Sequence, residues 1–133
     1  MKKNLTLKCR AELKAFVSTI FSKEKKKLQH LSYIFCSDDY LLEVNKNFLK
    51  HDYYTDIITF DLSESPKAIT GDIYISIDRV RDNAKQEGVS INHELHRVIF
   101  HGALHLCGYK DKKPTEQKLM RSKEDLYLKS YFK

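Results

Sequence analysis

Two histidines and an aspartate near the end of the sequence have the spacing of metal ligands. His101 and His105 are four residues apart, so on a helix they lie one above the other and their ring nitrogens can reach one ion. Gly108 follows, and glycine readily takes the left-handed conformation that ends a helix and turns the chain back. That turn would bring Asp111 round as a third ligand. We therefore predict one divalent cation, zinc as the best fit, at His101, His105 and Asp111.

The order of these ligands predicts hydrolytic chemistry. The pattern H-x-x-x-H-x-x-G-x-x-D has the spacing of the metzincin zinc site, whose last ligand is usually histidine. Three protein ligands leave a coordination position open, as in catalytic rather than structural zinc sites. Peptidases of the H-E-x-x-H type carry their general base directly after the first histidine, whereas this chain has Gly102 there. The pattern thus indicates a zinc hydrolase, disfavours a peptidase and identifies no general acid or base.

The residues around the histidines predict a helix that is buried on most sides. Apolar residues cover most of its surface between Ser90, a candidate N-cap, and about Cys107. The polar strip that remains holds Glu94, Arg97, His101 and His105. Two histidines in such a strip could also be ordinary hydrogen-bonded core residues, but the full spacing favours a metal site. The other histidines, interpreted as surface or structural residues, are His30, His51, His93 and His96.

Arg97 is the candidate catalytic residue of this strip. It lies one turn before His101, so its guanidinium could bind a scissile phosphate and stabilise charge in the transition state. An ion pair with Glu94 is the alternative. Asp56, at the start of a strand, is interpreted as structural rather than as a residue that orients a ligand.

The elements that must position these residues form one mixed domain. Strands are predicted at 30–36, 56–60 and 72–77. A loop over 63–70 is predicted between the second and third strands. Helices are predicted over 10–29, from Ser37, from Asp78 to Gly88, from Ser90 to about 107 and from Pro114. The last helix would turn Leu119, Met120 and Leu126 inward. We find no repeat or linker, so residues 1–133 are predicted to be one α+β domain with a small sheet and a buried metal-binding helix.

Charge and cysteine usage bear on partners and compartment. The formal net charge is +6, which weakly favours a polyanion such as nucleic acid. Lys110, Lys112 and Lys113 lie beside the third ligand and are candidates to hold RNA phosphates, with a solvated loop as the alternative.

The N-terminus is basic without a signal-peptide core, no apolar run could cross a membrane, and Cys9, Cys36 and Cys107 are too scattered for a disulfide framework. These features predict a cytoplasmic protein.

Four stretches, among them the metal motif described above, resemble the YbeY family of metal-dependent endoribonucleases. The metal motif reads His101-Gly102-x-Leu104-His105-Leu106-x-Gly108-Tyr109. Residues 55–60, Thr-Asp-Ile-Ile-Thr-Phe, are similar to the family's T-D-V-L-S-F, and residues 71–73 to its G-D-I. Residues 42–48 resemble its L-N-x-x-[FY] stretch. Two positions depart from the pattern: Asp111 stands where the family usually has histidine, and Leu49 where it tends to have arginine.

The resemblance implies a function in ribosome maturation. It implies single-strand-specific cleavage during maturation of small-subunit ribosomal RNA and ribosome quality control, with one zinc ion per chain. The partners would be ribosomal RNA and the small ribosomal subunit, without DNA or membrane. Two alternatives remain open: a ribosome-assembly protein that binds RNA around a structural metal, and a metallohydrolase of a non-RNA substrate.

Overall fold

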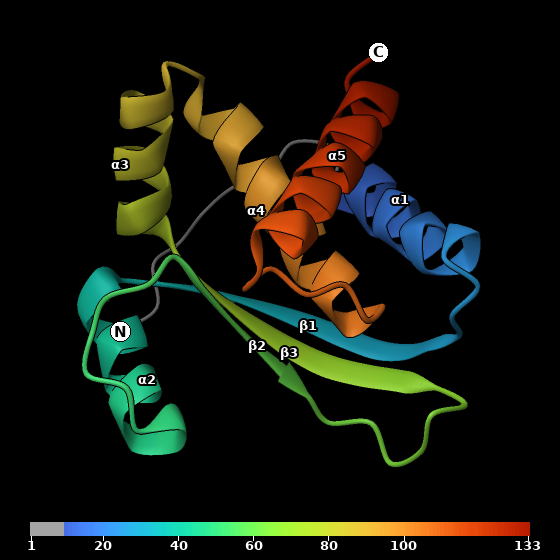
Figure 1. Cartoon of the computed structure of the whole chain (residues 1–133), viewed down its shortest axis with the longest axis horizontal. Helices are drawn as coiled ribbons and strands as arrows, with labels where there is room; N and C mark the ends of the chain where they lie inside the picture. The colour runs from blue at the N-terminus through green and yellow to red at the C-terminus, as the bar shows by residue number, and fades with distance from the viewer. Residues whose placement is uncertain (1–9) are drawn as a thin grey trace.

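A three-stranded sheet separates the helices of the domain into two layers (Figure 1). The computed structural model describes residues 10–133, so Cys9 and the basic N-terminal segment lie outside the described residues. The strands are β1 (Leu28–Cys36), β2 (Ile57–Asp61) and β3 (Ile69–Ser76). The helices are α1 (Arg10–Lys23), α2 (Asp38–Leu49), α3 (Ile77–Glu87), α4 (Ile91–Leu106) and α5 (Pro114–Tyr131). This order of elements, and the α+β class, are as predicted from the sequence.

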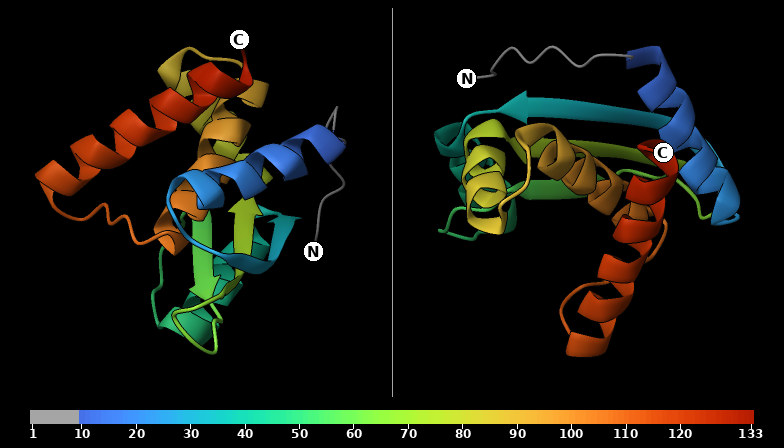
Figure 2. Two further views of the ribbon diagram at one scale, coloured as in Figure 1. Left: turned by 90° about the vertical axis from the view of Figure 1, so that its right-hand side faces the viewer. Right: turned by 90° about the horizontal axis from the view of Figure 1, so that it is seen from above.

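The central strand β3 pairs with both neighbours. It runs parallel to β1 and antiparallel to β2, so the strand order is β1-β3-β2. Its isoleucines alternate with Thr70, Asp72 and Tyr74, because successive side chains point to opposite faces. One face packs against α1 and α4, with α5 packed on α4, and the other face packs against α2. Figure 2 shows α1 and α5 as two inclined helices on the side of the domain away from α2.

Two predicted helix boundaries are wrong. The first helix ends at Lys23 instead of continuing toward residue 29, because Lys25 takes a left-handed φ of 61°. Leu28 instead pairs with Ile69 and begins β1, so strand pairing overrides the local helical pattern. The third helix is capped by Ser76, whose hydroxyl accepts from the Arg79 amide, and not by Asp78. The side chain of Asp78 accepts from the Asp38 amide at the start of α2.

The inward face of α5 differs from the one predicted. Met120 is buried as expected, but Leu119 and Leu126 are 50% and 55% exposed. The buried positions of α5 are Met120, Glu124, Tyr127 and Leu128. A glutamate takes a core-facing position because its carboxylate is held by charged and polar groups of α4. Apolar residues alone therefore indicate the wrong rotation for this helix.

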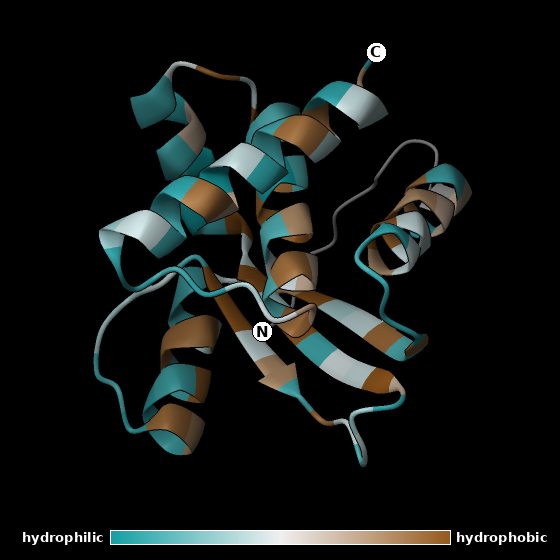
Figure 3. Cartoon of the chain, turned by 45° about the vertical axis from the view of Figure 1, so that its right-hand side comes forward, coloured by the Kyte–Doolittle hydropathy of each residue, from teal (hydrophilic) through white to brown (hydrophobic). Residues whose placement is uncertain are grey.

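Helix α4 is the centre of the packing, as its apolar pattern predicts. It contacts α1, α3, α5 and the sheet, and ten of its residues are buried. Figure 3 shows hydrophobic residues on the turns of α4 nearest the sheet, and an alternation of hydrophobic and more polar residues along the strands beneath them. Both Cys36 and Cys107 are buried free thiols. None of the helices described in residues 10–133 has both the length and the apolar character that a membrane crossing requires.

Gly102 allows α4 to approach the sheet closely. A Cβ atom added there would lie 2.9 Å from Cδ1 of Ile73 and 3.0 Å from Cδ1 of Ile57. Ile73 is fully buried, so it has little room to move away. At the position where H-E-x-x-H peptidases carry their catalytic glutamate, this chain has a glycine that allows close packing of α4 against the sheet.

We expect Gly102→Ala to destabilise the protein. Overpacking in a full core costs about 1–3 kcal/mol, and this should exceed the gain of about 1 kcal/mol in helix propensity. Urea denaturation followed by circular dichroism would measure the difference. A variant as stable as the parent would show that Ile73 and Ile57 can rearrange freely.

Candidate metal centre

The three predicted ligands converge at the C-terminal end of α4. The rings of His101 and His105 lie one turn apart on the helix in an edge-to-face arrangement, with centroids 4.5 Å apart and planes at 85°. The chain then turns at Gly108, whose φ is +106°, and returns Asp111 to the histidines. Oδ2 of Asp111 lies 3.2 Å from Nε2 of each ring. One ligand atom from each residue lies within 4.8 Å of the other two.

The outer nitrogen of each imidazole is already engaged. Nδ1 of His101 lies 2.6 Å from Oε2 of Glu124, and Nδ1 of His105 lies 2.9 Å from the Tyr109 carbonyl oxygen. Both partners are acceptors, so each Nδ1 carries a hydrogen, and each Nε2 faces Asp111 and would be the atom that binds a metal ion. A histidine bound to carboxylate or carbonyl at one nitrogen and to metal at the other is the usual arrangement of protein metal sites.

The donor set fits a divalent cation. Two neutral imidazole nitrogens and one carboxylate oxygen are ligands that zinc accepts, and in a tetrahedral site they would be about 3.3 Å apart. The two separations from Asp111, 3.2 Å each, match that edge, and all three donor atoms lie within 4.8 Å of one another. Two nitrogen lone pairs and a carboxylate oxygen aimed at one point repel one another unless a cation or protons lie between them. Among the described residues, this is the one such group of histidine, cysteine and acidic side chains.

The charges around His101 favour a cation at this point. Burial by itself would lower the pKa of His101, but the hydrogen bond to Glu124 and the negative charges of Glu124, Asp111 and Asp56 outweigh it and raise the pKa. The ring therefore retains a proton more readily than an isolated histidine when no metal is bound. A bound cation would displace that proton and take over its charge.

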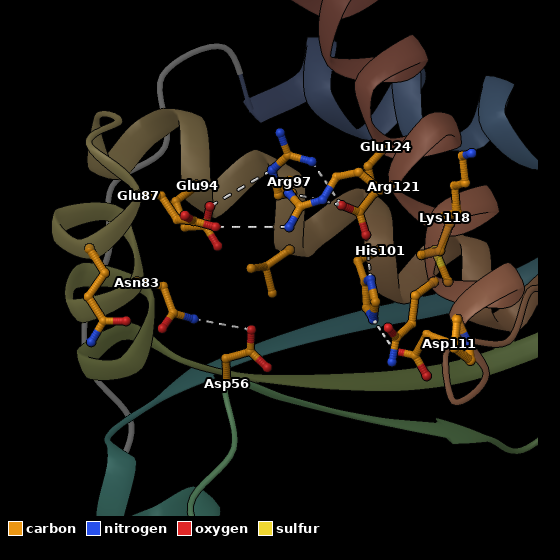
Figure 4. A pocket seen from close by; sticks show the side chains of 15 residues that line it. Asp56, Asn83, Glu87, Glu94, Arg97, His101, Asp111, Lys118, Arg121 and Glu124 are labelled. Atoms are coloured by element: carbon orange, nitrogen blue, oxygen red, sulfur yellow. Dashed lines mark hydrogen bonds and ion pairs between the residues drawn. The ribbon is translucent and has the colours of Figure 1, made fainter.

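Arg97 lies among carboxylates of α5. Its guanidinium nitrogens are 2.9 Å from Oε1 of Glu124 and 3.0 Å from Oδ1 of Asp125. The ion pair with Glu94 considered from the sequence is present at 3.9 Å. The Arg97 side chain is only 16% exposed. These contacts neutralise Glu124 and hold it against His101, as Figure 4 shows.

Glu124 is the site residue that sequence reasoning missed. It lies 23 residues after His101, on another helix, so no local spacing connects the two. Its signal in the sequence is a charged residue in phase with Met120 and Leu128, which are both buried. A buried glutamate requires a partner, but the sequence cannot name that partner.

Glu24, just after α1, supports the other histidine. Its carboxylate accepts hydrogen bonds from the hydroxyls of Tyr109 and Tyr127 and lies 3.2 Å from Nζ of Lys123. Burial would raise the pKa of Glu24, but these three partners together lower it. Because the Tyr109 carbonyl receives the His105 hydrogen bond, Glu24 connects α1 and α5 to the orientation of that ring.

Two hollows meet at the ligands. A cavity of about 770 Å³ lies between α3, α4 and α5, and a groove of about 480 Å³ runs from the end of α2 along β2. His101, Asp111 and Asp56 line both. Figure 4 shows the Asp56 side chain directed into the cavity, where Asn83 donates to it at 3.4 Å. Burial raises the pKa of Asp56, and the charge of His101 opposes this rise.

The three candidate phosphate-binding lysines are exposed on the loop that carries Asp111. Lys112 lines the groove. Lys113 is the residue that precedes α5, and its backbone amide donates to Glu116. The loop therefore places a positive charge beside the third ligand.

The comparisons with known proteins agree with this geometry. The chain matches the family model described as Endoribonuclease YbeY over residues 2–132. The endoribonuclease YbeY of Cytophaga hutchinsonii is 57% identical over 122 residues, which are 92% of this chain and 85% of the relative. That of Flavobacterium psychrophilum is 52% identical over 87% of this chain and 82% of the relative. The solution structure of TM1509 from Thermotoga maritima superposes with a TM-score of 0.65 at 30% identity, covering 96% of this chain and 83% of that one.

The fold, the ligand cluster and these relatives define a metal-dependent hydrolase that cleaves RNA internally. More particularly, the chain belongs to the endoribonuclease YbeY family.

Glu124→Gln tests the outer carboxylate. The amide keeps the shape of the side chain but removes the charge that orients His101, so metal affinity should fall by about 10–100-fold. Competition with a coloured chelator on the metal-free protein would measure it. Asp125→Asn is the matched control, because it removes a neighbouring carboxylate that contacts Arg97 but not His101. Equal affinities for the two variants would contradict the assigned role of Glu124.

Proposed function

We propose that the protein is a zinc-dependent, single-strand-specific endoribonuclease of the cytoplasm that acts in small-subunit ribosomal RNA maturation and ribosome quality control. The domain predicted over residues 1–133 is the proposed catalytic unit. Ribosomal RNA and the small ribosomal subunit are the proposed partners. The observation that carries the proposal is the position of the His101, His105 and Asp111 donor atoms where two open hollows meet.

In this proposal each residue has a defined task. His101, His105 and Asp111 would hold one zinc ion. When bound, such an ion supplies Lewis acidity to a phosphoryl oxygen, activates water, or both. Glu124 and the Tyr109 carbonyl orient the two imidazoles. Lys110, Lys112 and Lys113 would neutralise phosphates of the bound strand, since backbone charge dominates the affinity of proteins for nucleic acids.

The open surroundings of the ligands support a catalytic rather than a structural ion. The His105 side chain is 27% exposed and that of Asp111 is 37% exposed. A structural zinc site is normally closed by four protein ligands, whereas three ligands are gathered here. This favours the nuclease over an RNA-binding protein that merely contains a metal.

The test is cleavage of single-stranded ribosomal RNA fragments with and without a chelator. Wild-type protein should cut, the chelator should stop it, and added zinc should restore it. His105→Ala should lose both metal and activity while keeping its circular dichroism spectrum, because a domain of this size has a core that does not need the ion. His30→Ala, an exposed histidine of β1, is the control. Tight metal binding without cleavage would favour the alternative of an RNA-binding protein with a structural metal. Cleavage of non-RNA substrates but not of RNA would favour the alternative of a metallohydrolase with another substrate.

Arg97→Ala separates two roles of this residue. Because the guanidinium is held by Glu124 and Asp125, we expect metal affinity to fall while turnover at saturating metal stays within about twofold. A direct contact with the scissile phosphate would instead lower turnover more than tenfold, about 1.4 kcal/mol of barrier or more. Single-turnover cleavage at rising zinc concentrations would distinguish these results.

A further inference from the structure

An exposed pair of aromatic side chains stands at the entrance of the groove that leads to the metal ligands. The rings of His51 and Tyr53 are stacked, with centroids 5.1 Å apart and planes at 19°. The Tyr53 hydroxyl lies 2.9 Å from Nδ1 of His51. Both residues are exposed, Tyr53 to 56%. Both also line the groove that contains His105, Asp111 and Lys112.

A buried asparagine fixes this pair on the end of α2. Asn45 is 2% exposed, and its side-chain amide donates to the Tyr53 carbonyl at 2.9 Å. The backbone carbonyl of Asn45 accepts a hydrogen bond from the His51 backbone amide at 3.1 Å. Lys50, with a left-handed φ of 59°, turns the chain between the helix and the pair. The rings are therefore presented on an anchored segment, which lowers the entropy lost on binding.

We propose that His51 and Tyr53 form a stacking platform for an unpaired base of the RNA strand whose backbone enters the groove. This inference rests on the proposed function and names the feature of the substrate that the site selects. Aromatic faces bind bases by stacking without regard to sequence. A base inside a duplex has both faces covered by its neighbours, so this platform accepts only a base that is free of the stack.

The charges along the groove agree with such an occupant. Lys112 lies in the same groove beside Asp111, where it can contact a phosphate of the strand whose base rests on the platform. The groove thus contains the candidate ligands together with a group suited to a phosphate and a group suited to a base. Tyr54, the next aromatic residue, lies outside the groove: its ring packs under Arg79 and its hydroxyl donates to Asp39.

Binding to the metal-free protein tests the platform without cleavage. The probe is a short, fluorescein-labelled single-stranded RNA in the presence of chelator, measured by anisotropy. Tyr53→Ala should weaken its binding by about tenfold, as expected for the loss of one stacked base. Tyr53→Phe keeps the ring and should bind within about twofold of wild type, as should the control Tyr54→Ala. Binding of the same sequence as a duplex should not change in any variant, and equal melting temperatures would show that the fold is intact.

An abasic substitution in the RNA, combined with Tyr53→Ala in the protein, gives a double-mutant cycle. Removing one base near the scissile bond should weaken binding to the wild type by about as much as Tyr53→Ala does, and should cost the variant nothing more. If Tyr53→Ala binds single strands like the wild type, the platform is overturned while the nuclease assignment stands. If the wild type neither binds nor cleaves single-stranded RNA, the proposed function fails, and the platform with it.

Discussion

The structure depends on giving partners to the polar strip of a helix that is buried on almost every side. Helix α4 packs against α1, α3, α5 and the sheet, yet it carries Glu94, Arg97, His101 and His105 on one line. Buried charges are costly unless they are paired. Helix α5 supplies the carboxylates of Glu124 and Asp125 to this line. The rotation of α5 follows from that pairing, and so does the wall of the cavity beside the ligands.

Hydrogen bonds from several elements orient the side chains of the candidate metal centre. One histidine is oriented by a side chain of α5 and the other by a backbone carbonyl whose residue is tied to Glu24 at the end of α1. The first and last described helices therefore both determine the direction of the ligand atoms. Metal sites lose affinity when such outer partners are removed, so residues at the end of α1 and on α5 would influence the affinity of this candidate site for a metal ion.

The two positions that depart from the family pattern, Asp111 and Leu49, both lie in the groove beside the candidate metal centre. Asp111 is a shorter ligand than histidine, and the turn at Gly108 brings its carboxylate to 3.2 Å from both rings. Leu49 is 38% exposed and lines the groove, where the family tends to have an arginine. In this chain the segment after α2 brings the aromatic pair His51 and Tyr53 to the groove, and the loop after α4 brings Lys112 to it.

The sequence by itself determined the grouping of the three candidate metal ligands, the buried helix that carries two of them, and the order of helices and strands. These features depend on short spacings: i and i+4 on one helix, a glycine turn, and alternation along a strand. The tertiary structure alone decided the end of α1, the cap of α3, the face of α5 and the role of Glu124. Each of these depends on residues far apart in the chain, such as Leu28 with Ile69 and His101 with Glu124. Local patterns cannot encode such contacts, because a strand pairing or a buried ion pair has an energy only when both partners are in place.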